Sequence, residues 1–271
     1  GRWSEEYDIR FLFIEGTPPR DVLSIQSVWP IATPGQQWYS FSPNDIWNDL
    51  RFEPRDVMMN PDASMFKVRS AITGHGQNGE FTPKPHYIDI DSGNIEFEYQ
   101  VWKECSTVPV YPQGGTWLFD RAGWCPGDPT NLYEFDITPY VNPGEYHTID
   151  YGLVNIYGLN QADYRISNQL VSYGAHNFTL DAAVTGIIKP NSQIAANDRF
   201  NPACMDPEVA IQNTGSANLT SLDIDYWIEG GTAYTVTWNG NLEFLDTTRV
   251  VLPVSDLAFW EGTENIFHVV I

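Results

Sequence analysis

Basic residues are scarce in this chain of 271 residues, which has 14 Lys and Arg against 35 Asp and Glu. The formal net charge is therefore −21. Nucleic acids and anionic membrane surfaces are recognised through a basic footprint, so this balance argues against both as partners. Long apolar runs are also lacking. No stretch approaches the roughly 20 apolar residues that cross a bilayer, and we expect no membrane insertion.

Cysteine and histidine are also rare, with 3 Cys and 5 His in the whole chain. Three cysteines without a matching cluster of histidines make a poor metal site, so we expect no metal and no cofactor. Residues 89–94 begin like a calcium loop but lack its later bidentate Glu, and a hairpin turn accounts for them. The sequence also has no Gly-rich phosphate loop and no nucleophile elbow.

Aromatic residues and backbone breakers are abundant. Aromatics make up 14% of the chain, and there are 21 Gly and 19 Pro. Together with many short alternating runs, this composition predicts an all-β protein. Strands are predicted at residues 7–14, 22–29, 38–41, 66–73, 87–90, 95–102, 132–137, 147–153 and 164–173, and a short helical turn, capped by Ser42 or Asn44, at residues 44–50.

The segment 74–127 concentrates the unusual chemistry. Glu80 stands between Gly79 and Phe81, in a stretch so rich in Gly and Pro that irregular backbone is expected. Irregular backbone presents side chains to solvent or ligands. A predicted hairpin follows, with its turn at residues 91–94. The segment ends in the run Asp-Arg-Ala-Gly-Trp-Cys-Pro-Gly at residues 120–127.

These motifs resemble the second domain of the peptide-N-glycosidase F family. The resemblance rests on Gly-His-Gly at 74–76, Gly-Glu-Phe at 79–81 with His86 six residues after the Glu, the hairpin, Gly-Thr-Trp at 115–117 and the run at 120–127. It extends more weakly from about residue 7 to about residue 180. It implies a jelly-roll β-sandwich over residues 17–181, with residues 1–16 as a remnant strand of an upstream domain. In the alternative interpretation, that strand extends the following sheet.

A second module is expected over residues 182–271. Its short strands, separated by turns at near-regular intervals, predict a smaller immunoglobulin-like β-sandwich. The strands are expected near residues 187–191, 208–215, 222–228, 234–238, 248–252 and 266–271. The pattern is similar to the accessory adhesion-type β-modules of bacterial secreted enzymes.

The family resemblance also implies that Cys105 and Cys125 form a disulfide, and Cys204 would then be left over. A disulfide indicates an oxidising compartment, so a bacterial secreted or cell-surface protein is expected. Two free thiols are the alternative.

Glu80 is the candidate catalytic residue, because it aligns with a glutamate that works between the two domains of the resembled enzymes. This chain departs from the family by having Asn78 and Thr82 where two cysteines flank that glutamate. The loop is therefore expected to be less constrained. A solvated loop glutamate is the alternative interpretation.

Four further residues are candidates for substrate binding: Arg121, Asp120, Trp124 and His75. Arg121 offers a fork of donors, and Asp120 beside it balances the charge. Trp124 offers a flat face for a sugar, and His75 a proton donor. The alternatives are an Arg121–Asp120 ion pair, a Trp124 that fills the core, and a histidine without a role.

Two classes of function follow. In the first, the protein is a secreted glycoamidase-like enzyme that hydrolyses the amide joining Asn to N-acetylglucosamine in N-glycosylated proteins. The family takes an essential aspartate from its first domain, so an upstream domain or partner chain would complete the site and the chain alone would be inactive. In the second, it is a non-catalytic cell-surface binding or structural module. A third interpretation, a copper-dependent peptide monooxygenase, requires His pairs and a Met ligand that the sequence does not arrange.

Overall fold

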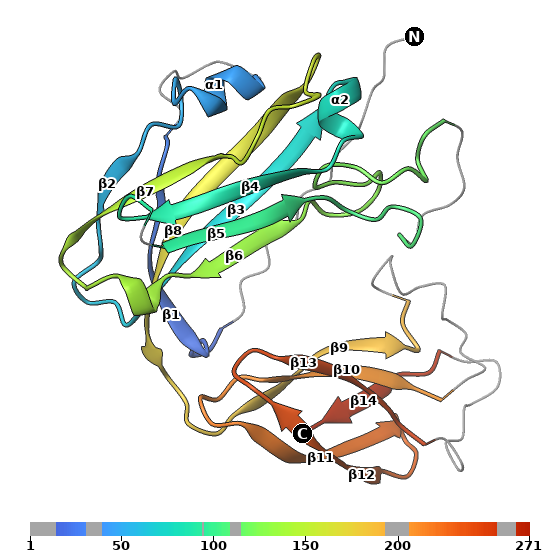
Figure 1. Cartoon of the computed structure of the whole chain (residues 1–271). Helices are drawn as coiled ribbons and strands as arrows, with labels where there is room; N and C mark the ends of the chain where they lie inside the picture. The colour runs from blue at the N-terminus through green and yellow to red at the C-terminus, as the bar shows by residue number, and fades with distance from the viewer. Residues whose placement is uncertain (1–14, 31–39, 94, 109–114, 193–205, 254–263) are drawn as a thin grey trace. The chain divides into compact units, whose positions relative to one another are not determined.

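The computed structural model describes residues 15–30, 40–93, 95–108, 115–192, 206–253 and 264–271 (Figure 1). Strands dominate, and the predicted all-β class of sandwiches is confirmed. One compact unit spans Asp21–Ala175, and the other contains His176–Ile271. The domain boundaries at 16/17 and 181/182 stay a prediction. Most of the expected remnant strand at residues 1–16, residues 38–39 of another expected strand and Cys204 lie outside the described residues.

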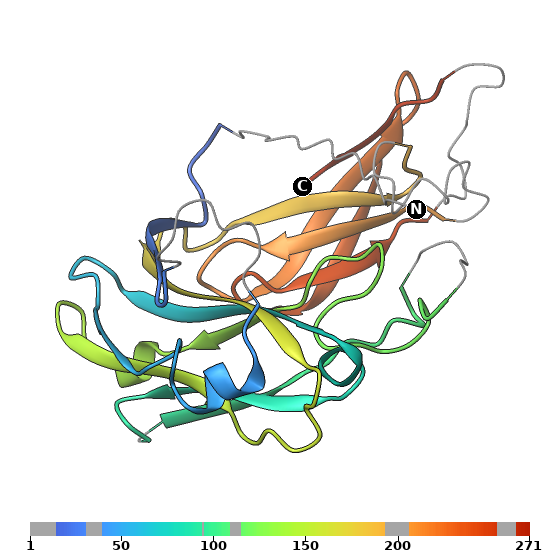
Figure 2. The same cartoon turned by 90° about the horizontal axis from the view of Figure 1, so that it is seen from above.

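The first unit stacks two four-stranded sheets, as seen from two directions in Figures 1 and 2. The strand order of one sheet is β1 (Arg20–Ser27), β8 (Asp163–His176), β3 (Met65–His75) and β6 (Leu132–Asp136). The order of the other is β2 (Arg55–Met58), β7 (Tyr146–Leu153), β4 (Lys84–Ile90) and β5 (Ile95–Val101).

Alternation in the sequence explains these strands. Every second residue of β3 is buried along its whole length, as expected for a strand with one face on a core. Strands β4 and β5 pair antiparallel from Lys84↔Val101 to Ile90↔Ile95, which confirms the predicted hairpin. Its turn uses left-handed backbone at Asp91, Ser92 and Gly93, where φ is 56°, 61° and 87°.

A single hydrophobic core lies between the two sheets. Its fully buried side chains come from both of them, and they include Phe66 and Ile72 of β3, Ile88 of β4 and Ile149 of β7. Burying each such side chain stabilises the fold by about 1.5–3 kcal/mol, so this core holds the ends of the strands in place. The loops that carry the candidate site are attached to those ends.

The second unit has its own core and two three-stranded antiparallel sheets. One sheet has the order β13 (Thr247–Val251), β10 (Glu208–Asn213) and β9 (Ala182–Lys189); the other has the order β12 (Tyr234–Leu242), β11 (Leu219–Ile228) and β14 (Phe267–Val270). The core includes Val209, Ile211 and Ile224, which are 0% exposed. All six predicted strand regions of this module contain or overlap a strand.

Short elements gave the main departures from prediction. The expected helical turn is α1 (Pro43–Trp47), and Ser42 caps it with a full capping box. Strand β2 and the 3₁₀ turn at Thr138–Tyr140 were not predicted. The stretch around Glu80 was expected to be irregular, but it forms a short helix, α2 (Gln77–Glu80). Within the described parts of the chain, none of the helices is long and apolar enough to reach across a bilayer.

Candidate functional site

Three segments meet at one end of the first sandwich: the end of β3, helix α2, and residues 115–131, which lead into β6. Figures 1 and 2 both show α2 beside the chain that connects β5 to β6. Backbone hydrogen bonds join them. Ala122 N donates to Glu80 O at 2.9 Å, and Gly74 N donates to Ala122 O at 2.9 Å. The two loops that the sequence marked as unusual are therefore in direct contact.

Glycine makes this close approach possible. A Cβ on Gly74 would lie 2.1 Å from Gly79 O and 2.5 Å from the Ala122 Cβ. Gly123 has φ +78°, and a Cβ there would lie 2.0 Å from Ile72 O. Real Cβ atoms do not approach a carbonyl so closely, so both positions require glycine. These glycines belong to the motifs that carry the family resemblance, and their role is packing.

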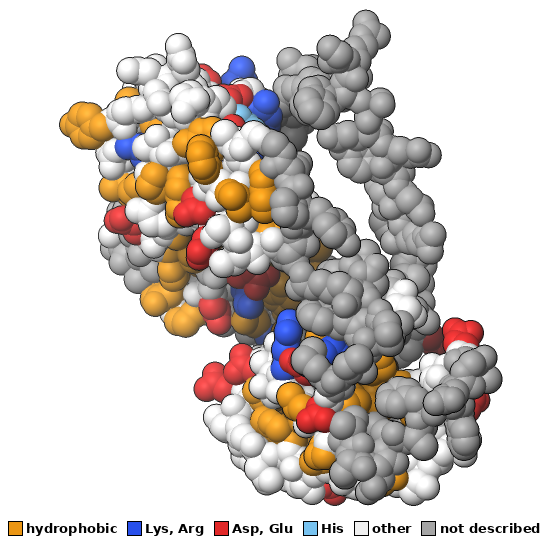
Figure 3. Space-filling model, turned by 90° about the vertical axis from the view of Figure 1, so that its right-hand side faces the viewer, with side chains coloured by type: hydrophobic (Ala, Val, Ile, Leu, Met, Phe, Trp, Pro, Cys, Tyr) orange, Lys and Arg blue, Asp and Glu red, His pale blue; other side chains and the backbone are white. Residues whose placement is uncertain are grey.

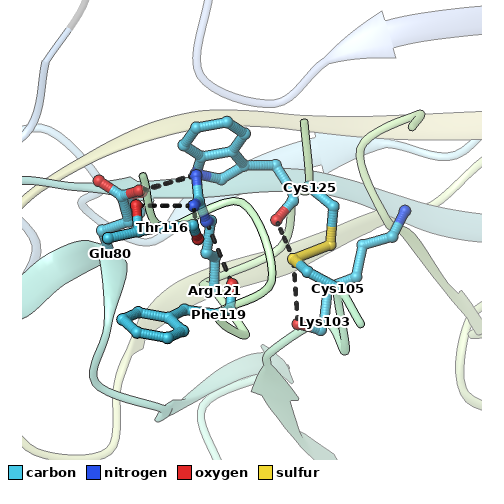
Figure 4. Close-up of polar contacts among 9 residues, drawn as sticks. Glu80, Lys103, Cys105, Thr116, Phe119, Arg121 and Cys125 are labelled. Atoms are coloured by element: carbon cyan, nitrogen blue, oxygen red, sulfur yellow. Dashed lines mark hydrogen bonds and ion pairs between the residues drawn. A yellow bond between two sulfur atoms is a disulfide. The ribbon is translucent and has the colours of Figure 1, made fainter. Parts of the chain in front are cut away.

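Glu80 and Arg121 form an ion pair at this junction (Figure 4). Arg121 Nη1 lies 3.1 Å from Glu80 Oε1. The Arg121 side chain is 5% exposed and the Glu80 side chain 20%. The alternatives considered from the sequence were an ion pair between Arg121 and Asp120 and a Glu80 in solvent, and the Glu80–Arg121 pair is neither. In the structure, Lys84 Nζ contacts Asn155 Oδ1 and Tyr157 O.

The rest of the Arg121 guanidinium is held inside the protein. Nε donates to Phe119 O at 3.2 Å, and Nη2 donates to Thr116 O and to Thr116 Oγ1. The cation also lies over two rings, 5.4 Å from the Phe81 centroid and 4.8 Å from the Trp124 centroid. A buried cation that is paired and hydrogen-bonded in this way orders the loop around it. Arg121 therefore positions Glu80 and residues 116–124.

Two opposing effects act on the pKa of the Glu80 carboxyl. Its partial burial raises its pKa, and the positive charge of Arg121 lowers it. Burial prevails, so the pKa lies above the usual value for Glu. Glu80 is thus a partly exposed carboxyl whose position is set by Arg121.

His75 and Trp124 stack on each other next to the ion pair. Their ring centroids are 5.8 Å apart and their planes differ by 29°. Trp124 Nε1 donates to Gly74 O at 3.1 Å, which fixes the indole against β3. Burial, followed by the charge of Arg165, lowers the pKa of His75, so this histidine is neutral at pH 7. Both side chains are half-buried, so Trp124 is neither the fully open platform nor the core filler of the two predicted alternatives.

The Asp120 carboxylate accepts a hydrogen bond from the backbone of Cys105, one of the two disulfide cysteines. Cys105 N donates to Asp120 Oδ1 at 3.1 Å. Cys105 and Cys125 are joined, as the family resemblance implied, and close a loop of sequence separation 20. Asp120 also lines an open pocket of about 520 Å³ with six other residues: Gln77, Phe81, Trp102, Thr116, Leu118 and Phe119. Aromatic rings with a few polar groups are typical of ligand pockets.

The pocket exposes apolar surface. Phe119 is 59% and Leu118 47% exposed, and Phe119 meets Phe81 edge-on with centroids 6.4 Å apart. Figure 3, which views this side of the first unit, shows hydrophobic side chains interspersed with polar and charged ones. Sequence reasoning missed Phe81, Trp102 and Phe119 as site residues. Phe81 and Phe119 directly follow or precede the candidates Glu80 and Asp120, and this adjacency was the only signal available.

Asn78 stands at one of the two positions where the family resemblance led us to expect a cysteine, and its side chain anchors α2. Its Nδ2 donates to Asn160 O at 2.5 Å, which ties α2 to the loop before β8. Gly79 is buried against Ala162 of the same loop, where a Cβ would lie 3.1 Å from the Ala162 Cβ. Helix α2 is therefore constrained without a disulfide. Across the described ranges, no group of three or more His, Cys, Asp or Glu side chains is arranged to hold a metal ion.

Comparison with known proteins gives one family match. Residues 44–173 match the family model described as peptide-N-glycosidase F, C terminal. One similar solved structure is a peptide-N(4)-(N-acetyl-β-D-glucosaminyl)asparagine amidase, with 24% identity, 45% of this chain and 43% of that chain covered, and a TM-score of 0.40. Another is PNGase F, a glycosylasparaginase from Flavobacterium meningosepticum, with 25% identity, the same coverage and a TM-score of 0.37.

The matches are partial. The chain spans less than half the length of these two solved relatives. PNGF-II also matches, with 25% identity over 45% of this chain and 25% of its own, at a TM-score of 0.36. Among curated proteins, none matches.

Proposed function

Because residues 44–173 belong to the family of the peptide-N-glycosidase F C-terminal domain, we propose that this protein recognises N-linked glycans and supplies one half of a glycoamidase site. The reaction would be hydrolysis of the amide that joins Asn to N-acetylglucosamine. The other half would come from an upstream domain or a partner chain. The Cys105–Cys125 disulfide supports an oxidising compartment, hence a secreted or cell-surface location.

The Glu80–Arg121 pair carries this proposal. The pair stands beside an open pocket, since Phe81 and Thr116 contact Arg121 and also line the pocket. Glu80 keeps 20% of its side chain exposed, whereas Arg121 is almost completely covered. The arrangement holds a carboxylate in one place and leaves part of it accessible. A sugar hydroxyl, or a water that attacks the amide, would donate a hydrogen bond to such a carboxylate.

The pocket supplies the second requirement of glycan binding. Pyranose rings have apolar faces that pack on aromatic side chains, and Phe119 and Trp102 offer such surfaces. Gln77 and Asp120 add polar groups that can bond sugar hydroxyls. Hydrolysis needs a further acidic group in contact with the scissile amide, which we assign to the other half of the site.

One observation favours a second candidate, a binding module without catalysis. Arg121 uses its donors on Glu80, Phe119 O and Thr116, so it has little capacity left for a substrate oxygen. In that case Glu80 and Arg121 hold the loops together, and the pocket alone contacts the glycan.

Calorimetric titration of the protein with a glycopeptide that carries the N-glycan core tests binding, with the same peptide without the glycan as reference. We expect binding of the glycosylated form only. Phe119→Ala should weaken it about tenfold, the effect of losing one aromatic contact of about 1.4 kcal/mol. Tyr146→Ala is the matched control, because Tyr146 is 66% exposed at the start of β7, the opposite end of the sheet from the site. Equal affinities for the two peptides would refute glycan recognition.

Glycan release from a denatured glycoprotein separates the two candidates. The chain alone should release glycan orders of magnitude more slowly than an intact glycoamidase, since removing a group that acts in the transition state has effects of that size. If a partner that completes the site is added, release should rise, and Glu80→Gln should abolish the rise. A rise that Glu80→Gln leaves intact would rule out a role for Glu80 in catalysis.

A further inference from the structure

Three aromatic side chains with polar atoms meet inside the first sandwich. His86 of β4, Tyr151 of β7 and Tyr164 of β8 are each 0% exposed. The His86 ring stacks on Tyr151 with centroids 5.8 Å apart, and it meets Tyr164 edge-on at 5.2 Å. Because Tyr164 is paired with Gly74 on β3, the cluster lies at the end of the sandwich that carries the candidate site.

The polar atoms of this cluster are only partly paired. His86 Nδ1 and the Tyr151 hydroxyl are 2.7 Å apart and share one hydrogen bond. Burial lowers the pKa of His86 to about 3, so the ring is neutral and either donates or accepts at its other nitrogen. That nitrogen, Nε2, and the Tyr164 hydroxyl have no hydrogen-bond partner among the described residues.

A second pair of buried polar side chains belongs to the same interior. Ser70 of β3 and Asn168 of β8 are register partners, and they are 0% and 3% exposed. Ser70 Oγ donates to Asn168 Oδ1 at 2.6 Å. The amide nitrogen Nδ2 of Asn168 has no partner within the described part of the chain. Buried positions on both sheets thus carry polar atoms that lack a hydrogen-bond partner among the described residues.

Native proteins rarely leave such atoms unpaired, because a buried donor or acceptor without a partner loses the bonds it made to water. The ligand that satisfies them must be neutral, since the cluster contains no charged side chain. It must accept a hydrogen bond, since Asn168 Nδ2 only donates, whereas the Tyr164 hydroxyl and the neutral His86 ring can each donate or accept. We propose that bound water occupies the interior of the first sandwich and is hydrogen-bonded to His86 Nε2, the Tyr164 hydroxyl and Asn168 Nδ2. Buried water of this kind makes two to four bonds to polar groups and is part of the fold.

A crystal structure of the full chain at high resolution tests the proposal directly. We expect ordered water within about 3 Å of His86 Nε2 and of Asn168 Nδ2. A dry interior at these atoms overturns the proposal.

Substitution of Tyr164 gives a test in solution. The direction in which the midpoint of thermal unfolding changes shows whether the Tyr164 hydroxyl is bonded to water or unpaired. A hydroxyl bonded to water contributes stability, so Tyr164→Phe should lower the midpoint of thermal unfolding by about 2–4 °C. Tyr151→Phe, which loses a hydroxyl bonded to His86, should cause a shift of similar size. Tyr157→Phe is the control that should leave the midpoint unchanged, because Tyr157 is 83% exposed. A hydroxyl that is truly unpaired is unfavourable, so a midpoint that rises or stays constant in Tyr164→Phe overturns the proposal.

Discussion

Arg121 Nη1 lies 3.1 Å from Oε1 of Glu80, and this contact joins helix α2 to the loop that follows the disulfide. A backbone hydrogen bond joins the same two segments, since Ala122 N donates to Glu80 O. The two residues are 41 positions apart in sequence, yet they hold one junction together by a charge pair and a hydrogen bond. The junction therefore fixes the positions of α2 and the Ala122 loop relative to each other.

Loss of the buried cation should be strongly destabilising. Arg121→Ala leaves Glu80 without its partner and removes the contacts with Phe81 and Trp124. We expect a loss of about 3–5 kcal/mol in the free energy of unfolding, the usual effect of breaking a buried pair. Urea denaturation of the variant and the wild type measures it.

Arg55→Ala is the matched control for Arg121→Ala. Arg55 forms a 2.6 Å ion pair with Glu53, but the two side chains are 36% and 48% exposed. An exposed pair contributes about 0–1 kcal/mol, so this variant should unfold nearly like the wild type. Equal losses in the two variants would show that the burial of Arg121 has no special role.

Gly74 should not tolerate a side chain. In Gly74→Ala the new methyl would meet Gly79 O and the Ala122 Cβ, and α2 or the Ala122 loop would have to move. We expect a loss of at least about 1–3 kcal/mol in unfolding free energy, as in other overpacked sites. Gly174→Ala, whose Cβ would meet atoms no nearer than 3.6 Å, should be far milder. Equal unfolding free energies for Gly74→Ala and Gly174→Ala would contradict the prediction.

The disulfide should be detectable by thiol titration of the denatured, unreduced protein. Cys105 and Cys125 are bonded, so one thiol, that of Cys204, is expected to react. Replacing both bonded cysteines with Ser should lower the free energy of unfolding by about 3 kcal/mol, the chain-entropy value for a loop of this size. Three reactive thiols would contradict the structure.

The Asp91 carboxyl should make stability depend on pH. Its burial acts to raise the pKa, but hydrogen bonds from the His147 side chain and the Thr148 amide outweigh it and hold the pKa below the usual value. A carboxyl whose pKa is lower in the folded state stabilises the protein above its unfolded pKa, and this contribution is lost as the pH falls through the folded pKa.

Asp91→Asn is the variant that isolates this effect. It should lower the unfolding free energy at pH 7 by only about 1 kcal/mol, because the Asp91 side chain is 37% exposed and screened by solvent. The difference from the wild type should shrink as the pH falls below the ordinary Asp value of 3.8. Asp62→Asn, at an exposed residue, serves as control. A difference that is the same at every pH would exclude the mechanism.

Strands were the most predictable part of this protein. Alternation in residues 66–73 and 87–90 places every second side chain on one face, and a face of that kind is stable only against a core. Strands β3 and β4 therefore appear where expected. Helix α2 was not predictable, since four residues that include Gly79 have no helical tendency of their own. Its bonds to Ala122 and Asn160 come from loops far along the chain.

The sequence by itself determined the all-β class and the position of the hairpin, because these depend on local periodicity and on turn chemistry. The choice of polar partners was decided only in the folded molecule. Arg121 pairs with Glu80 and not with its neighbour Asp120, and His86 is buried against Tyr151. Such choices depend on which side chains the packing of two sheets brings within about 3 Å and removes from water, and spacing along the chain does not encode that distance.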